Sequence, residues 1–280
     1  MNATDQPRTR RRVVPGVCVP LIALPLLLGC TEARPEEPLT PFRHTQRTPT
    51  PVEQRLLAPR AKHRLLIRVL AFEEDRARLK LSLELLNAAP PEGLDVSPWI
   101  ANHMLLVAIE REKLPMLLAN LPKPVSGFEV ALGHASIDHP VTITSNTVRL
   151  RNIPYLLGDG KRLARDFPIG DFRILFRMEE PGDDSLRTDT SIGILPQHYT
   201  HSSLRLSDPH DRSTEGFSIE PLRVNHPLST NDCWIITLDP RTISDSTSWG
   251  LADAMLRGES EGNRIQAIVF ITLEEPADEP

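Results

Sequence analysis

The apolar residues of this chain lie in short runs, separated by connections that contain proline or glycine. Short runs bounded by turn residues are typical of the strands of an all-β domain. We expect short helices at 111–121 and 248–257. The predicted strands are 65–72, 79–85, 104–109, 128–132, 141–151, 172–178, 192–195, 217–224, 233–238 and 265–273. The sequence therefore predicts an all-β fold.

The clearest strand pattern is at 79–85, where four leucines alternate with Lys80, Ser82 and Glu84. A two-residue period puts apolar side chains on one face of a strand and polar side chains on the other. An apolar run at 65–72 precedes this segment, and the polar residues 73–76 suit a hairpin turn. We therefore expect the two runs to pair as a hairpin.

Residues 147–178 combine strand patterns with a turn at Gly158-Asp159-Gly160 and the run 167–174. This arrangement resembles the closing strands of bacterial immunoglobulin-like β-sandwich domains, and residues 83–88 resemble an earlier strand of that fold. The resemblance covers roughly 62–180. It implies a fold and no chemistry.

The strand pattern is interrupted at 181–184, which reads Pro-Gly-Asp-Asp. We expect a domain boundary there, because proline and glycine favour connections over strands. The predicted organisation is a β-sandwich domain at 62–180 and a second β-rich domain at 181–280 that ends in an acidic tail. A single larger sandwich is the alternative.

The N-terminus has the parts of a secretory signal peptide. Four arginines at 8–12 precede an uncharged run at 13–28, and a glycine and a cysteine follow. A membrane-spanning helix needs ~20 apolar residues, whereas three prolines interrupt this run. Residues 1–29 are therefore predicted to be a signal peptide. Ordinary secretion and an uncleaved anchor are the alternatives for this segment.

The residues Leu27-Leu28-Gly29-Cys30 resemble the lipobox of bacterial lipoproteins. This resemblance implies cleavage before Cys30 and acylation of its thiol and new amine, and two or more acyl chains anchor a protein stably. Thr31 is not the aspartate associated with inner-membrane retention, so an outer membrane is expected if the host has one. Residues 30–61 are rich in proline and lack apolar periodicity, which predicts a disordered, lipidated tether.

The charge and the cysteines of the mature chain exclude two further possibilities. The leader carries four arginines and one aspartate, so its removal takes the formal charge from −5 to −8. An acidic protein is poorly suited to neutralise phosphates, so a nucleic-acid partner is not expected. Cys18 leaves with the leader and Cys30 carries lipid, so Cys233 alone remains and no internal disulfide is expected.

A serine-hydrolase pattern, G-x-S-x-G, is present at 258–262. That chemistry requires a strand that leads into the serine and a helix that leaves it. Here a predicted helix precedes the motif and the predicted strand 265–273 follows it. We interpret the match as a polar turn. No other motif indicates a catalytic residue or a cofactor.

Two groups of side chains are candidate metal ligands. The first joins His198 and His201 with His210 and Asp211, since imidazoles and carboxylates bind zinc or copper. A solvent-exposed polar loop is the alternative for that segment. The second is a calcium hypothesis for clustered carboxylates, with a solvated connection as the alternative. Its residues are Glu179, Glu180, Asp183 and Asp184.

The expected protein is thus a lipid-anchored lipoprotein of the cell envelope with a β-sandwich head on a tether. The expected function is non-catalytic, as a scaffold, assembly, adhesion or binding module that contacts another envelope protein. An exported metal-dependent hydrolase and a protein that captures a small ligand or glycan are the alternatives.

Overall fold

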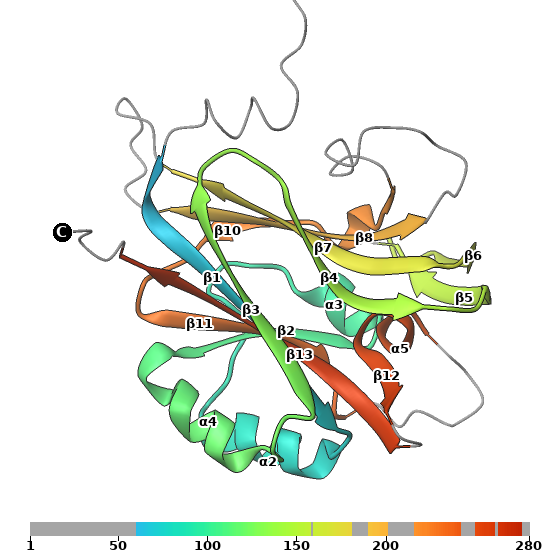
Figure 1. Cartoon of the computed structure of the whole chain (residues 1–280), viewed down its shortest axis with the longest axis horizontal. Coiled ribbons are helices and arrows are strands. Elements are labelled where there is room, and N and C mark those ends of the chain that lie inside the picture. The colour runs from blue at the N-terminus through green and yellow to red at the C-terminus, as the bar shows by residue number, and fades with distance from the viewer. Residues whose placement is uncertain are drawn as a thin grey trace, which may run out of the picture. The chain divides into compact units, whose positions relative to one another are not determined.

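The chain forms a large antiparallel sheet, sheet A, whose strands come from both halves of the sequence (Figure 1). The structure, a computed structural model, describes residues 60–157, 159–180, 190–200, 216–241, 250–260 and 263–275. The strand order in sheet A is β2-β11-β13-β1-β3, with β12 beside β13. These strands are β1 (Arg60–Glu73), β2 (Met104–Glu110), β3 (Ser126–His134), β11 (Asp232–Leu238), β12 (Arg257–Ser260) and β13 (Asn263–Glu274).

A second antiparallel sheet, sheet B, has the order β10-β8-β7-β4, with the short β9 beside β8. A separate hairpin is formed by β5 and β6. The bounds are β4 (His139–Asn146), β5 (Leu150–Leu156), β6 (Arg162–Phe167), β7 (Gly170–Glu179), β8 (Ser191–Thr200), β9 (Phe217–Ser218) and β10 (Val224–Pro227).

The main core lies between the two sheets. Alternate residues of β13, such as Val269 and Ile271, belong to one buried cluster with Phe172, Ile174 and Phe176 of β7. Two sheets that pack face to face in this way form a sandwich. The expected fold class, an all-β sandwich, is confirmed.

Helices cover the outer face of β2, β11 and β13 and part of β1, so that the middle of sheet A is buried on both sides, whereas the outer face of β3 is exposed. Figure 1 shows α2 (Arg76–Leu85) and α4 (Leu114–Asn120) on the side of sheet A away from sheet B. Leu79, Leu83 and Leu117 of these helices form a second buried cluster with Ile268 and Phe270 of β13. The remaining helices are α3 (Ser97–Ala101), α5 (Leu251–Leu256) and the 3-10 turns η1 (Arg111–Lys113) and η2 (Glu220–Leu222).

The prediction of a strand at 79–85, paired with 65–72, is wrong, because this segment is helix α2. Both sides of β1 are already taken by β13 and β3, so no edge of β1 is left for a hairpin partner. The segment consists mainly of arginine, alanine, lysine, leucine and glutamate, which favour helix. The Asp75 side chain caps the helix by accepting a hydrogen bond from the backbone N–H of Arg78 at 2.9 Å.

Most other predicted elements are present with shifted ends. The helix expected at 111–121 is η1 followed by α4, and α5 lies within the helix expected at 248–257. The strand expected at 141–151 is divided between β4 and β5, and the strand expected at 217–224 is divided among β9, η2 and the start of β10. Strand β6 was not predicted.

The strand pairings join the two stretches that we expected to be separate domains. Strand β1, from the first stretch, pairs with β13 from the second, and β11 pairs with β2. The described residues belong to one compact unit. The described strands therefore form the alternative arrangement, a single larger sandwich. Residues 181–189 and the N-terminal residues 1–59, which include Cys30, lie outside the described residues.

Two leucine variants test the helical assignment of α2. Leu83 is 6% exposed and Leu81 is 57% exposed, although both would share one face of a strand. We expect Leu83→Ala to lower the free energy of unfolding by about 2–5 kcal/mol. Leu81→Ala should change it by less than about 0.5 kcal/mol. Urea denaturation measures both values, and similar losses in the two variants would contradict the helix.

Candidate functional site

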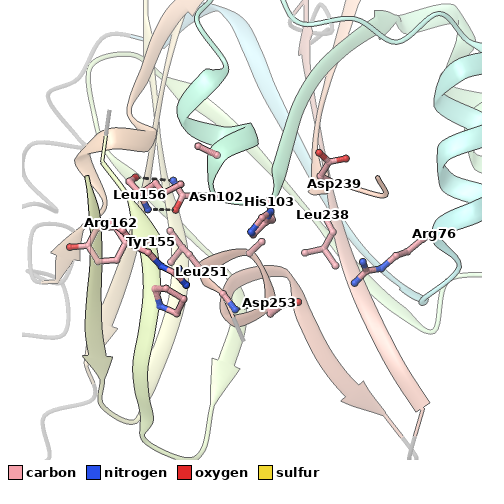
Figure 2. Close-up of a pocket in the computed structure, with 14 residues that line it drawn as sticks. Arg76, Asn102, His103, Tyr155, Leu156, Arg162, Leu238, Asp239, Leu251 and Asp253 are labelled. Carbon is pink, nitrogen blue, oxygen red and sulfur yellow. Dashed lines mark hydrogen bonds between the residues drawn. The ribbon is translucent and has the colours of Figure 1, made fainter. Parts of the chain in front are cut away.

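A cleft of about 370 Å³ lies at one end of the sandwich (Figure 2). Its walls come from the connection between α3 and β2, the β5–β6 hairpin, the end of β11, and α5, with Arg76 of α2 at one side. The lining residues are Arg76, Ala101, Asn102, His103, Pro154, Tyr155, Leu156, Arg162, Leu238, Asp239, Gly250, Leu251, Ala252 and Asp253.

The amide of Asn102 fixes one wall of this cleft. Its Oδ1 accepts a hydrogen bond from the backbone N–H of Leu156 at 2.8 Å, and its Nδ2 donates to the carbonyl of Leu156 at 2.9 Å. These are the dashed lines between the two residues in Figure 2. Nδ2 also donates to the carbonyl of Pro98 at 2.8 Å. A buried amide with these partners ties the β5–β6 hairpin to the end of sheet A.

His103 has an unusual backbone conformation at the mouth of the cleft. Its φ is +62°, which costs a residue other than glycine about 1–3 kcal/mol. The backbone on both sides holds it there: its N–H donates to the carbonyl of Ile100 at 2.9 Å, and its carbonyl accepts from the N–H of Asp239 at 2.9 Å. The exposed His103 side chain lies between the two sides of the cleft in Figure 2.

The carboxylate of Asp239 is buried and is paired with Arg241. The Arg241 guanidinium donates to it through Nε at 2.9 Å and Nη2 at 3.0 Å. The backbone N–H of Arg241 adds a third hydrogen bond of 2.9 Å. This bidentate contact satisfies both oxygens of the carboxylate.

Asp253 is the second acid in the cleft, and it belongs to a chain of alternating charges. It accepts from the N–H of Gly250 at 3.0 Å and forms an ion pair with Arg257. Arg257 in turn donates to Glu74 at 3.0 Å, and Glu74 pairs with Arg76 at 2.5 Å. Because Arg257 is only 7% exposed, removing either carboxylate would leave a poorly compensated buried charge.

These contacts pair both carboxylates of the cleft with groups of the protein itself. Both of its carboxylates are committed to guanidinium and backbone donors, whereas a general base must reach a substrate proton. The lining also holds His103 and Tyr155, whose side chains can act as acid, base or nucleophile.

A second, more open hollow of about 680 Å³ lies beside β10. Its lining includes His226, whose ring lies 5.9 Å from that of Trp234. Asp232 also lines it and stands opposite Glu110 in the pairing of β11 with β2. Burial, and then the neighbouring Glu110, raises the pKa of Asp232 above its ordinary value. This hollow also brings the hydroxyl of Thr190 within 3.1 Å of Nδ1 of His63.

The structure places one of the four zinc or copper candidates. His198 lies in β8 and is 1% exposed, with its ring 5.1 Å from that of Phe167 and 4.8 Å from that of Phe172. His201, His210 and Asp211 lie outside the described residues. Within the part of the chain that the structure describes, no three His, Cys, Asp or Glu side chains come together to hold a metal ion. The hypothesis stays a prediction.

Two of the four calcium candidates are placed, and both contact the protein itself. Glu180 accepts hydrogen bonds from the backbone N–H groups of Lys62 and His63, the second at 3.3 Å. Glu179 accepts from the side chain of Asn225 at 3.3 Å. Asp183 and Asp184 lie outside the described residues, so the calcium hypothesis also stays a prediction.

The remaining sequence candidates are structural. Gly258 lies in β12, which pairs with β13 as a hairpin, so the G-x-S-x-G match is not followed by a helix. Cys233 is buried in β11, and burial raises the pKa of its thiol to about 12. A thiol of that kind is protonated and unreactive at neutral pH.

The free side of β3 is the second candidate site. Strand β3 has nine residues and pairs with β1 along one side. It contains no proline and no lysine, and its first four residues are exposed. Phe128 is 45% exposed. A long edge strand with exposed apolar side chains is a ready surface for pairing with another strand.

The edge strands β2, β10, β4, β5 and β6 each carry a feature that opposes such pairing. The free side of β2 is covered at Ala108, where the backbones of Ala108 and Ala89 exchange two hydrogen bonds. Strand β10 has four residues and ends in proline. Strand β4 contains Pro140 and an irregular register between Thr142 and Thr144. Strand β5 contains a proline and a register shift, and three of the six residues of β6 are charged. Proline, bulges, charges, short strands and covering segments all oppose edge-to-edge pairing.

No protein-family model, curated protein or solved structure matches this chain. None of the helices in the described ranges has the length and apolar character that crossing a bilayer requires.

Proposed function

We propose that this chain is a lipid-anchored, non-catalytic assembly module of the bacterial cell envelope. Cys30 carries the lipid, the proline-rich tether holds the head away from the membrane, and the outer membrane is the expected location where the host has one. The head contacts a further protein molecule of the envelope through the free side of β3.

The unprotected edge of β3 is the observation that carries this proposal. The middle strands of sheet A are covered on both faces, and β3 is the long edge strand whose free side the described residues leave open. Pairing there would use the backbone groups of β3 and would cover the exposed ring of Phe128.

The cleft supports a second candidate function, the capture of a small ligand or glycan. Its volume of about 370 Å³ and its neutralised carboxylates suit binding. A ligand that binds the folded state would raise the temperature of unfolding. The metal-dependent hydrolase remains the third alternative, because three of its four ligands lie outside the described residues.

The lipid anchor is tested by Cys30→Ser in the native host. We expect this variant to leave the membrane fraction and to lose the mass of the acyl chains, because the lipid is the proposed anchor. Cell fractionation and mass spectrometry measure both effects. Cys18→Ser, inside the leader, is the control and should stay in the membrane fraction. Membrane retention of the Cys30 variant would contradict the anchor.

The assembly role is tested by photo-cross-linking in intact cells. A photo-reactive benzophenone amino acid replaces Phe128 in one strain and Val148, which is 63% exposed outside β3, in another. We expect a discrete protein adduct from position 128 and not from position 148, because the proposed contact is at β3. Absence of an adduct, or the same adducts from both positions, would contradict the role.

A further inference from the structure

We propose that the strand that pairs with the free side of β3 is β3 of a second copy of this chain. The two strands run antiparallel around a two-fold axis at Val130, so that sheet A continues from one copy into the other. This inference rests on the proposed function and names the partner for the same edge. The argument comes from the side chains that this register brings together.

The first face of β3 is apolar and is complementary to itself. Phe128, Val130 and Leu132 share this face, since they stand opposite residues 69, 67 and 65 of β1, all of which belong to the main core. Around an axis at Val130, Phe128 of one copy lies opposite Leu132 of the other. Phe128 is 45% exposed, so pairing with the second strand would cover part of its ring. Covering apolar surface stabilises the pair.

The second face of β3 is small and carries one acidic side chain. It presents Gly127, Glu129, Ala131 and Gly133. In the same register Glu129 lies opposite Ala131 of the second copy, and the two glycines lie opposite each other. Each Glu129 keeps its own partner, Arg68, at 2.6 Å. The two carboxylates therefore do not face each other, and the face offers no bulk that would hold the strands apart.

Neighbouring registers fit less well. An axis at Glu129 would place the two carboxylates directly opposite each other, which destabilises a strand pair. An axis at Ala131 would place Val130 opposite Leu132 but Phe128 opposite His134, so the exposed ring of Phe128 would lose its apolar partner. A two-fold contact of this kind closes on itself and gives a dimer.

Two variants of Ala131 test both the partner and the register. Ala131 is exposed and would face Glu129 of the second copy. Ala131→Glu therefore places two like-charge pairs across the dimer, and Ala131→Lys places two opposite-charge pairs at the same positions. We expect Ala131→Glu to raise the dissociation constant of the dimer by about tenfold or more. Ala131→Lys should leave it within about threefold of the wild-type value or lower it.

The measurement is sedimentation of the lipidated full-length chain in density-matched detergent, over micromolar to millimolar concentrations. Urea unfolding of each variant confirms that it is folded. A concentration-dependent dimer that responds to the sign of the charge at 131 supports the inference. A wild-type monomer at every concentration, or equal effects of the two charges, would overturn it.

The identity of the protein that is cross-linked through position 128 in cells distinguishes this inference from the proposed function. A cross-linked dimer of the chain supports both. An adduct with a different envelope protein leaves the assembly role standing and overturns the second copy as partner. Absence of any adduct specific to position 128 contradicts both.

Discussion

Burial of β13 on both of its faces is the constraint on which the rest of the structure depends. Its residues from Gln266 to Leu273 are all buried. Val269 and Ile271 pack toward sheet B, while Ile268 and Phe270 pack toward α2 and α4. The strands β1 and β11 flank β13. Apolar burial is the main favourable term in folding. Because its two faces pack against different layers, β13 connects the sandwich core with the helical layer.

The same constraint decides where this protein can act. The middle strands of sheet A are covered on both faces, so the surfaces that remain on this sheet are its ends and its edges, including the exposed strand β3. At one end, the cleft places its acids against arginines, which leaves shape and hydrogen bonding as its means of recognition. At the edges, covering segments, prolines, bulges and charges protect the described strands other than β3. The fold leaves the edge of β3 open, and pairing of β3 with a partner strand is consistent with this.

Much of the β architecture could be predicted from the sequence, because its strands are short apolar runs between turns. The runs at 233–238 and 265–273 correspond closely to β11 and β13. Their nearly continuous apolar character also carried a signal that was missed, since strands buried on both faces lose the usual alternation. That signal would have indicated the helical layer over sheet A.

The alternating leucines of 79–85 indicate a strand, so helix α2 could not be predicted from this pattern. In the helix the same leucines do not share one face, and Leu81 and Leu85 are exposed to solvent. Because β1 pairs with β13 and β3, residues 79–85 cannot pair with β1 as a strand. Pairing between strands that are far apart in the sequence leaves no local pattern that would reveal this. The same holds for the cleft. Nothing near Asn102 indicates that its amide will bind Leu156, and nothing near Asp239 reveals that it meets the carbonyl of His103.

Hydrogen exchange at β3 answers most directly whether its open edge is used as proposed. The full-length lipidated chain is exchanged at a series of protein concentrations, and peptides that cover 126–134 are compared with those that cover β2 and β10. The account predicts that the amides of β3 become protected as the concentration rises, because pairing with a second strand satisfies the N–H groups on its free side. The other two edges should not change. Exchange at β3 that is independent of concentration would contradict pairing with a second copy.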